Sequence, residues 1–181
     1  PIMDNLDLQI KTIHKNKSRS SNYYTNQIKS YEMSVQWEND FDSFYPILVE
    51  NKKMHDSKPT HSLEELKKLN DIMPNKLKLL LIKKENEVIG GNLILNANDR
   101  VSIIFYNMID YTYADLQVAT IQVIESIKWA HDKNISFLDF GVSHESETNN
   151  PLSPKLSLIK FKEEFRQSKS LSRWFKISIY C

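Results

Sequence analysis

The chain has 181 residues, 40% of them hydrophobic and 10% aromatic, and its 24 basic and 23 acidic side chains leave a formal net charge of +1. Such a chain can fill one ordinary hydrophobic core, and its charge gives no bulk reason to bind nucleic acid or an anionic membrane. The one cysteine, Cys181, is the last residue, which excludes an internal disulfide and suits a reducing compartment. No run of about 18 apolar residues predicts a membrane span, and no signal-peptide pattern is present, so we expect a cytoplasmic protein.

Glycine is rare, because the chain holds only Gly90, Gly91 and Gly141. Phosphate-binding loops of the GxxxxGK and GxGxxG kinds need several glycines close together. P-loop nucleotide hydrolysis and Rossmann dinucleotide binding are therefore not expected.

Residues 1–34 are predicted to form an N-terminal arm or linker, or the remnant of a preceding domain. Their stretch "HKNKSRSSNYYTNQIKS" is polar and basic and has no clear period. Residues 35–181 are predicted to form one domain that starts with a helix over about 40–55. A second helix follows Ser62, which forms a capping-box pattern with Glu65.

Three strands are predicted over 77–84, 87–97 and 100–110, and a turn at Glu85 and Asn86 joins the first two. Together they read as an antiparallel meander. A heavily buried helix is predicted over about 115–133, with a narrow solvent-facing side at Gln122, Glu125 and Asp132.

The stretch "ISFLDFG" that follows is predicted to be a short buried strand, and the order strand, helix, strand indicates a parallel crossover. A helix over about 153–167 and a last strand at "RWFKISIY" complete the chain. This order of elements predicts an α/β fold with a mixed sheet.

Lys162 stands among the apolar residues of the last predicted helix, four residues after Leu158 and three before Phe165. A lysine in an apolar stripe is costly unless its ammonium reaches water or finds a partner. One reading is therefore a lysine that extends to the edge of the stripe. The other is a cation held in a cleft to stabilise an oxyanion.

Asp139 ends the "SFLDFG" strand, and ligands of α/β sheets bind at the carboxyl ends of parallel strands. It is either a cap of the next loop or part of a site at this rim, together with Gly141, Ser143, His144 and Glu145. His61 precedes the N-cap residue Ser62, so it is either a packing residue or a base and substrate contact. The histidines show no metal-ligand spacing with acids or cysteine, so no metal is expected.

The segments "KPTHSLEEL", "EVIGG", "IKWAHDKNISFLDFGVSHE" and "LIKFKEEF" occur in an order that resembles the FemAB-like branch of the GNAT acyltransferase superfamily. The resemblance covers about residues 40–180. It implies a GNAT-like fold with an antiparallel meander, a buried crossover helix and a C-terminal helix and strand. It also implies acyl transfer from acyl-CoA or aminoacyl-tRNA to an amine or hydroxyl, in peptidoglycan-bridge or surface-polysaccharide assembly.

The resemblance also implies site residues. The family's helix lysine, which is placed to stabilise the oxyanion, falls on Lys162. Its turn falls on Asp139, Gly141 and Ser143, and its K-P-x-H segment on Lys58, Pro59 and His61.

Three features depart from the family. Arg166 replaces the glycine that follows the helix phenylalanine, and the strand "IIFY" keeps only Tyr106 of the family's pattern. The glycine-containing pyrophosphate loop of GNAT proteins is absent, because its place reads "DYTYADLQVAT". Binding of an anion such as the CoA pyrophosphate at this place would then depend on the backbone N–H groups at the start of the helix.

The sequence therefore predicts an acyltransferase in which Lys162, His61 and Asp139 are catalytic, with a small-molecule, glycan or peptide acceptor. The expected substrate-binding residues are Lys58, Tyr106, Tyr113, Gly141, Ser143 and Glu145. Two alternatives stay open: a degenerate GNAT-like domain that binds without catalysis, and half of a two-domain ligase that uses aminoacyl-tRNA. Under the second alternative, the basic N-terminal stretch with Tyr23 and Tyr24 is a candidate tRNA contact. Oligomerisation is left open.

Overall fold

The fold is given by a computed structural model that describes residues 1–2, 4–13, 21–143 and 153–165. Its sheet has the strand order β1-β2-β3-β4-β5, and neighbouring strands are antiparallel except for β5, which runs parallel to β4. The predicted meander, parallel crossover and α/β class are confirmed. The strands are β1 (Met33–Trp37), β2 (Leu77–Lys84), β3 (Glu87–Asn96), β4 (Val101–Ile109) and β5 (Phe137–Asp139).

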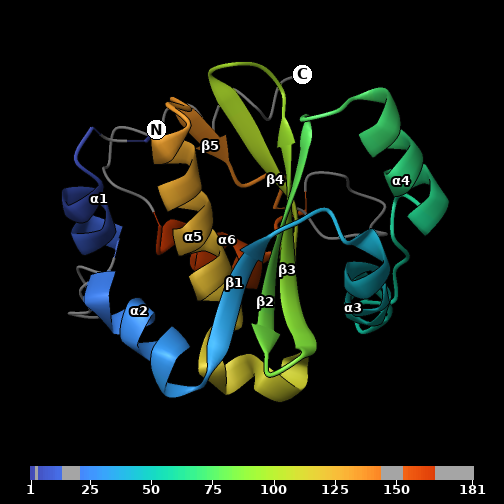
Figure 1. The fold of residues 1–181 in the computed structure, drawn as a ribbon, viewed down its shortest axis with the longest axis horizontal. Helices are drawn as coiled ribbons and strands as arrows, with labels where there is room; N and C mark the ends of the chain where they lie inside the picture. The colour runs from blue at the N-terminus through green and yellow to red at the C-terminus, as the bar shows by residue number, and fades with distance from the viewer. Residues whose placement is uncertain (3, 14–20, 144–152, 166–181) are drawn as a thin grey trace.

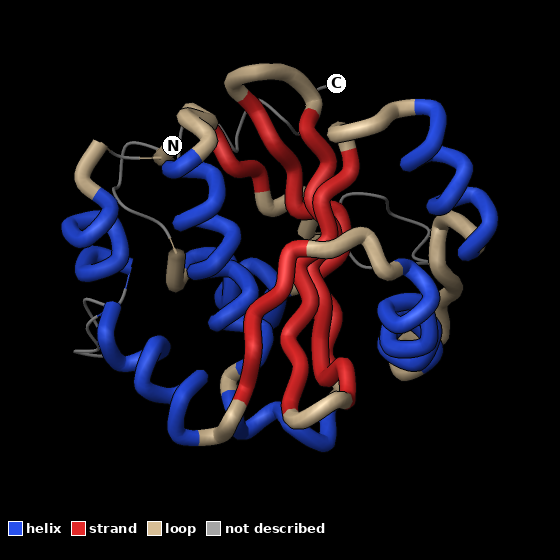
Figure 2. The backbone as a smooth tube through the Cα atoms, viewed as in Figure 1, coloured by secondary structure: helices blue, strands red, loops and turns tan. Residues whose placement is uncertain are grey.

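Helices cover both faces of the sheet, with α1, α2 and α5 on one side and α3 and α4 on the other (Figures 1 and 2). Each face has its own hydrophobic core. On the α5 side, isoleucines of β2, β3 and β4 pack against the helix, and on the α3 side leucines of β2 and β3 pack against phenylalanines. The helices are α1 (Leu6–Ile13), α2 (Ser21–Ser30), α3 (Phe41–Lys53), α4 (Leu63–Ile72), the 3-10 helix η1 (Tyr111–Leu116), α5 (Val118–Asp132) and α6 (Leu156–Glu163).

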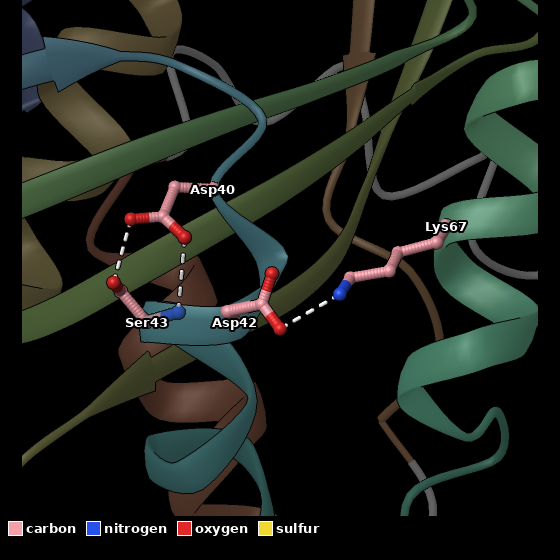
Figure 3. Close-up of polar contacts among 4 residues, drawn as sticks. All are labelled: Asp40, Asp42, Ser43 and Lys67. Atoms are coloured by element: carbon pink, nitrogen blue, oxygen red, sulfur yellow. Dashed lines mark hydrogen bonds and ion pairs between the residues drawn. The ribbon is translucent and has the colours of Figure 1, made fainter.

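Side-chain caps fix the starts of the two helices on the α3 face. The Asp40 carboxylate accepts hydrogen bonds from the backbone N–H (3.1 Å) and the hydroxyl (2.6 Å) of Ser43, as Figure 3 shows. An ion pair of 2.7 Å between Lys67 and Asp42 then joins α4 to α3. The predicted capping box of Ser62 and Glu65 is present at the start of α4. These contacts position the segment between α3 and α4, which carries His61.

The N-terminal segment is not the solvated arm that its polarity predicts. Ile10 of α1 and Tyr24 of α2 are each 1% exposed and belong to the core on the α5 face. The boundary expected after residue 34 falls inside β1, a strand that the sequence analysis missed. The apolar residues Met33, Val35 and Trp37 alternate with polar ones in the sequence, a pattern that is typical of a strand. One buried apolar side chain from each helix therefore anchors this segment to the core, although other residues of both helices are exposed.

Two further expectations about burial are wrong. Gln122 does not face solvent, since it is 0% exposed and its side-chain amide donates to the Met108 carbonyl (3.1 Å). Strand β5 is not buried, because it lies at the edge of the described sheet, where Phe137 is 44% exposed. Helix α6 ends at Glu163, earlier than expected. The predicted last strand lies outside the described residues.

Candidate active site

Strands β4 and β5 separate soon after they begin. Their parallel pairing runs only from Val101↔Phe137 to Ile103↔Asp139, whereas β4 continues to Ile109. A cavity of about 270 Å³ opens beside the unpaired part of β4. Its lining is mostly apolar and comes from α3, β4, η1, α5, α6 and the residues that follow β5 and α6: Asn51, Ile104, Asn107, Ile109, Tyr111, Ala119, Val123, Phe140, Leu158, Phe161, Lys162 and Phe165.

Asn51 closes one end of this opening. Its side-chain amide donates to the carbonyl of Ile109, and the Ile109 N–H donates back to the Asn51 side-chain oxygen (3.3 Å). Asn51 is 5% exposed, so both bonds are shielded from water. The carboxamide thus pairs with the backbone of β4 as a neighbouring strand would. The sequence analysis missed Asn51, because a single asparagine in a helix carries no such signal.

Asn107 supplies a polar atom to the cavity wall. Its Nδ2 donates to the carbonyl of Ala119 (3.4 Å), whereas its Oδ1 is buried and has no hydrogen-bond partner in the described part of the chain. The side-chain oxygens of Asn92 and Gln122 behind it are buried and unpaired in the same way. Buried acceptors without donors are rare in folded proteins. Asn107 therefore offers an acceptor to a ligand with an N–H or O–H group.

Lys162 lies in the same wall, half-buried, and its ammonium holds the turn after β5. Nζ donates to the carbonyl oxygens of Gly141 (2.9 Å) and Val142 (2.6 Å). Burial lowers the pKa of Lys162 from its ordinary 10.5 to about 8, and the nearby Asp139 carboxylate opposes the shift. An ammonium has three N–H donors, so one remains beyond these two bonds. The inward position that the helical spacing predicts is confirmed.

The turn that Lys162 holds contains three of the predicted site residues. Gly141 has a φ of +65°, which disfavours a side chain there, and its N–H donates to the Asp139 carboxylate (2.8 Å). The carbonyl of Ser143 accepts from the N–H of Lys155 at the start of α6 (3.0 Å). Asp139, Gly141, Ser143 and Lys162 are therefore brought together. Glu145 lies outside the described residues.

His61 and Tyr106 form a separate cluster. Strand β4 has a bulge at Phe105, since its pairing steps from Leu93↔Tyr106 to Ile94↔Ile104. The extra residue turns Tyr106 toward the α3 face, although Ile104 faces α5. The His61 ring lies 5.6 Å from the Phe105 ring, and its buried Nδ1 has no described partner.

The remaining predicted residues differ in their surroundings. The Tyr106 hydroxyl accepts a hydrogen bond from the N–H of Thr60 (3.2 Å), so this buried tyrosine anchors the segment before α4. Lys58 in that segment is exposed. The Tyr113 hydroxyl donates to Glu87 at the start of β3 (3.0 Å), and Tyr111, not Tyr113, lines the cavity. No described hydrogen bond or ring contact joins His61 or Tyr113 to Lys162.

Among the described residues, no three or more His, Cys, Asp and Glu side chains are grouped so that they could hold a metal ion. No helix in the described part of the chain is long and apolar enough to cross a membrane.

Several solved structures share the fold. One is an aminoglycoside acetyltransferase from an uncultured soil metagenomic sample in complex with trehalose (TM-score 0.56, 12% identity, 78% of this chain and 92% of that one). A GNAT family acetyltransferase from Elizabethkingia anophelis with acetyl-CoA bound has a TM-score of 0.51 and 17% identity, covering 72% of this chain and 73% of that one. A ribosomal-protein-alanine N-acetyltransferase from Brucella melitensis biovar Abortus 2308 has a TM-score of 0.53 and 12% identity, covering 73% and 89%.

At these identities the likeness concerns the fold alone, and it confirms the expected GNAT-like architecture. No curated protein sequence matches the chain. A family model described as an acetyltransferase (GNAT) domain matches residues 14–149, well over half of the chain. The chain therefore belongs to the acetyltransferase (GNAT) domain family.

Proposed function

We propose that this protein is an acyl-CoA-dependent acyltransferase that moves an acyl group, acetyl in the simplest case, onto an amine or hydroxyl. One observation carries the proposal: a half-buried ammonium, that of Lys162, lines an apolar cavity where β4 and β5 separate. Membership of the acetyltransferase (GNAT) family supports the reaction class. The order of the "KPTH", "DFG" and helix-lysine segments supports the FemAB-like branch and, with it, an acceptor in cell-envelope or surface-polysaccharide synthesis.

The cavity fits the acyl end of such a donor. The pantetheine arm of CoA is narrow and alternates apolar links with two amides. The apolar wall suits the links, and the unpaired Oδ1 of Asn107 suits an amide N–H. The wall also includes Ala119 in the first turn of α5, where Gln117 gives no side-chain cap, so backbone N–H groups there are free of a capping side chain and can donate to a phosphate oxygen. A structural neighbour carries acetyl-CoA.

Acetyl-CoA, when bound, supplies a thioester. The carbonyl carbon of the thioester would form a bond to the acceptor nitrogen or oxygen, and its carbon–sulfur bond would break. The proton lost by the acceptor would neutralise the thiolate of the departing CoA. Lys162 is mostly protonated at pH 7 because its pKa is about 8. Its remaining N–H would be donated to the carbonyl oxygen, on which negative charge develops. The two carbonyls that already bind Nζ hold the ammonium in place, so little reorganisation is needed.

Two residues are candidates for handling the acceptor. Asp139 is on the turn that Lys162 binds, so its carboxylate is proposed to orient the acceptor or take up its proton. His61 lies beside Phe105 at the outward bulge of β4, and we propose it as an acceptor contact. Asp139→Asn should therefore lower kcat, whereas His61→Gln should mainly raise KM for the acceptor.

A second candidate is a GNAT-like domain that binds a ligand without catalysis. The segment before α5 favours it, because this segment contains no glycine and carries the acids Asp110 and Asp115. Both acids would oppose a pyrophosphate group at this helix start.

Thermal melts of the purified chain with acetyl-CoA, longer acyl-CoAs, free CoA and tRNA separate these functions. A ligand at a hundredfold its Kd adds about 2.7 kcal/mol of stability. The proposal predicts stabilisation by acyl-CoA, followed by release of free thiol when amines are added. Stabilisation by CoA without thiol release for any acceptor would favour the binding domain. Stabilisation by tRNA alone would favour half of an aminoacyl-tRNA-dependent ligase.

A further inference from the structure

A layer of polar residues crosses the apolar core between the sheet and α5. It consists of Asn92 and Asn107 on the strands and of Gln122 and Ser126 on the helix. The two asparagines are opposite each other in the register of β3 and β4, and both side chains bind α5. The next pair on the same face consists of two isoleucines of the apolar core. A polar side chain at such a depth costs stability unless its hydrogen bonds are made.

The orientation of Asn92 is set by Ser126, and both residues are 0% exposed. The Ser126 hydroxyl donates to the backbone carbonyl of Gln122, four residues earlier in α5 (2.7 Å). Its oxygen is therefore left to accept a hydrogen bond, and it does so from Nδ2 of Asn92 (2.8 Å). This bond directs the amide group of Asn92 to the helix.

Asn107 is left with an unused acceptor. Directly opposite residues on adjacent strands have Cβ atoms about 4.5–5.5 Å apart, so two such asparagine side chains can reach each other. No hydrogen bond joins Asn92 to Asn107 among the described residues, and Oδ1 of Asn107 is buried without a partner there. Nδ2 of Asn107 donates to the carbonyl of Ala119 (3.4 Å), so exchanging the two ends of this amide would place an oxygen against that carbonyl.

Gly90 gives the layer its room on the sheet. A Cβ at Gly90 would lie 2.4 Å from Nε2 of Gln122 and 2.6 Å from Cγ1 of Val118, so a larger residue would displace one or both side chains. Gln122 is 0% exposed and donates from this position to the carbonyl of Met108 (3.1 Å). The amide groups of Asn92 and Gln122 are thus both directed to acceptors other than Asn107.

We propose that Ser126 is a positioning residue that keeps Oδ1 of Asn107 available for an amide N–H of the acyl donor. Asn107 lines the cavity, whereas Ser126 and Asn92 do not, so Ser126 acts only through the two asparagines. The unpaired acceptor lowers the stability of the protein without ligand and gains its partner when the donor binds. That the N–H belongs to the donor rests on the proposed function, in which the donor occupies this cavity.

Removing the Ser126 hydroxyl tests this role. In Ser126→Ala, the amide group of Asn92 loses its acceptor and can turn to Oδ1 of Asn107. The Kd of acetyl-CoA should then rise about tenfold, whereas kcat at saturating donor should stay within about twofold. Asn92→Val removes the competing amide, so the double variant Ser126→Ala/Asn92→Val should recover most of the wild-type affinity. A serine with a merely structural role predicts no such rescue.

Ser102→Ala is the matched control. Ser102 is also 0% exposed, but it donates to Asn96 and does not line the cavity. The Kd of acetyl-CoA should therefore be the same in Ser102→Ala and in the wild-type protein. Two results would overturn the proposal: wild-type affinity in Ser126→Ala, or a double variant that binds as weakly as Ser126→Ala or more weakly.

Urea unfolding tests the same role without any ligand. The coupling between Asn92→Val and Asn107→Leu is measured by a double-mutant cycle, once with Ser126 present and once in Ser126→Ala. The coupling, expressed as a factor in the unfolding equilibrium constant, should be at least fivefold larger in Ser126→Ala, because the two asparagines bind each other only there. The same coupling in both backgrounds would contradict the role of Ser126.

These outcomes are distinct from failure of the proposed function. The larger coupling in a chain that binds no acyl-CoA would contradict the acyltransferase, while the positioning of Asn107 by Ser126 would stand. Turnover of acetyl-CoA with equal coupling in both backgrounds would do the reverse.

Discussion

Replacing Lys162 by methionine keeps an unbranched side chain in the cavity wall and removes its ammonium. The pKa of Lys162 is lowered from 10.5 to about 8, which at about 1.4 kcal/mol per pH unit is a burial cost near 3 kcal/mol. The ammonium still has contact with water, so solvent screening reduces this to about 1–2 kcal/mol. The hydrogen bonds to Gly141 and Val142 contribute a similar amount with the opposite sign. The free energy of unfolding should therefore change by less than about 2 kcal/mol.

Loss of one oxyanion donor typically lowers kcat about 10²- to 10³-fold, so activity should fall much further than stability. The assay pairs thermal or urea unfolding with thiol release from acetyl-CoA. Lys160→Met is the matched control, because Lys160 is exposed on the same helix. The oxyanion role would be refuted by a folded Lys162→Met protein that retains wild-type kcat. It would also be refuted by a drop in kcat that the Lys160→Met control reproduces.

Three more predictions follow from particular contacts. The pKa of Lys162 is lower in the folded protein than in the unfolded chain, so the unfolded chain binds more protons between about pH 8 and 10.5. The free energy of unfolding of the wild-type protein should therefore rise with pH over this range, relative to that of Lys162→Met. Unfolding of both proteins measured at several pH values checks this. Gly91→Ala should cost about 1–3 kcal/mol of stability, since its Cβ would lie 2.7 Å from Cε2 of the buried Phe44; an unchanged melting temperature would contradict this packing. Ser62→Ala should lose about 1 kcal/mol in urea unfolding by removing the capping box, whereas Ser62→Asp should retain most of it.

The elements with a strong local signal could be predicted from the sequence. The meander, the capping box at Ser62 and the helix α5 each follow from periodicity and turn chemistry. The inward position of Lys162 followed in the same way, because residues three and four apart share one side of a helix. The sequence could therefore place this lysine in an apolar wall before any fold was known.

Other features depend on contacts between distant parts of the chain. The bulge at Phe105 turns Tyr106 to the α3 face, so this tyrosine could not be separated from the cavity residues by its spacing. Asn51 reaches the backbone of Ile109, 58 residues away, and nothing local marks it. Gln122 reads as a solvent-facing residue, yet it is buried because the Met108 carbonyl needs a donor. Tertiary pairing decided each of these positions.

Calorimetric titration of acetyl-CoA into the wild-type protein and an Ala119→Phe variant tests the central claim most directly. Ala119 lines the cavity from the first turn of α5, so a phenylalanine there should fill the space next to Asn107. We expect acetyl-CoA to bind the wild-type protein and to bind the variant at least tenfold more weakly, with similar melting temperatures of both proteins without ligand. No binding to the wild-type protein, or equal affinity for the two proteins, would contradict a donor site between β4 and β5.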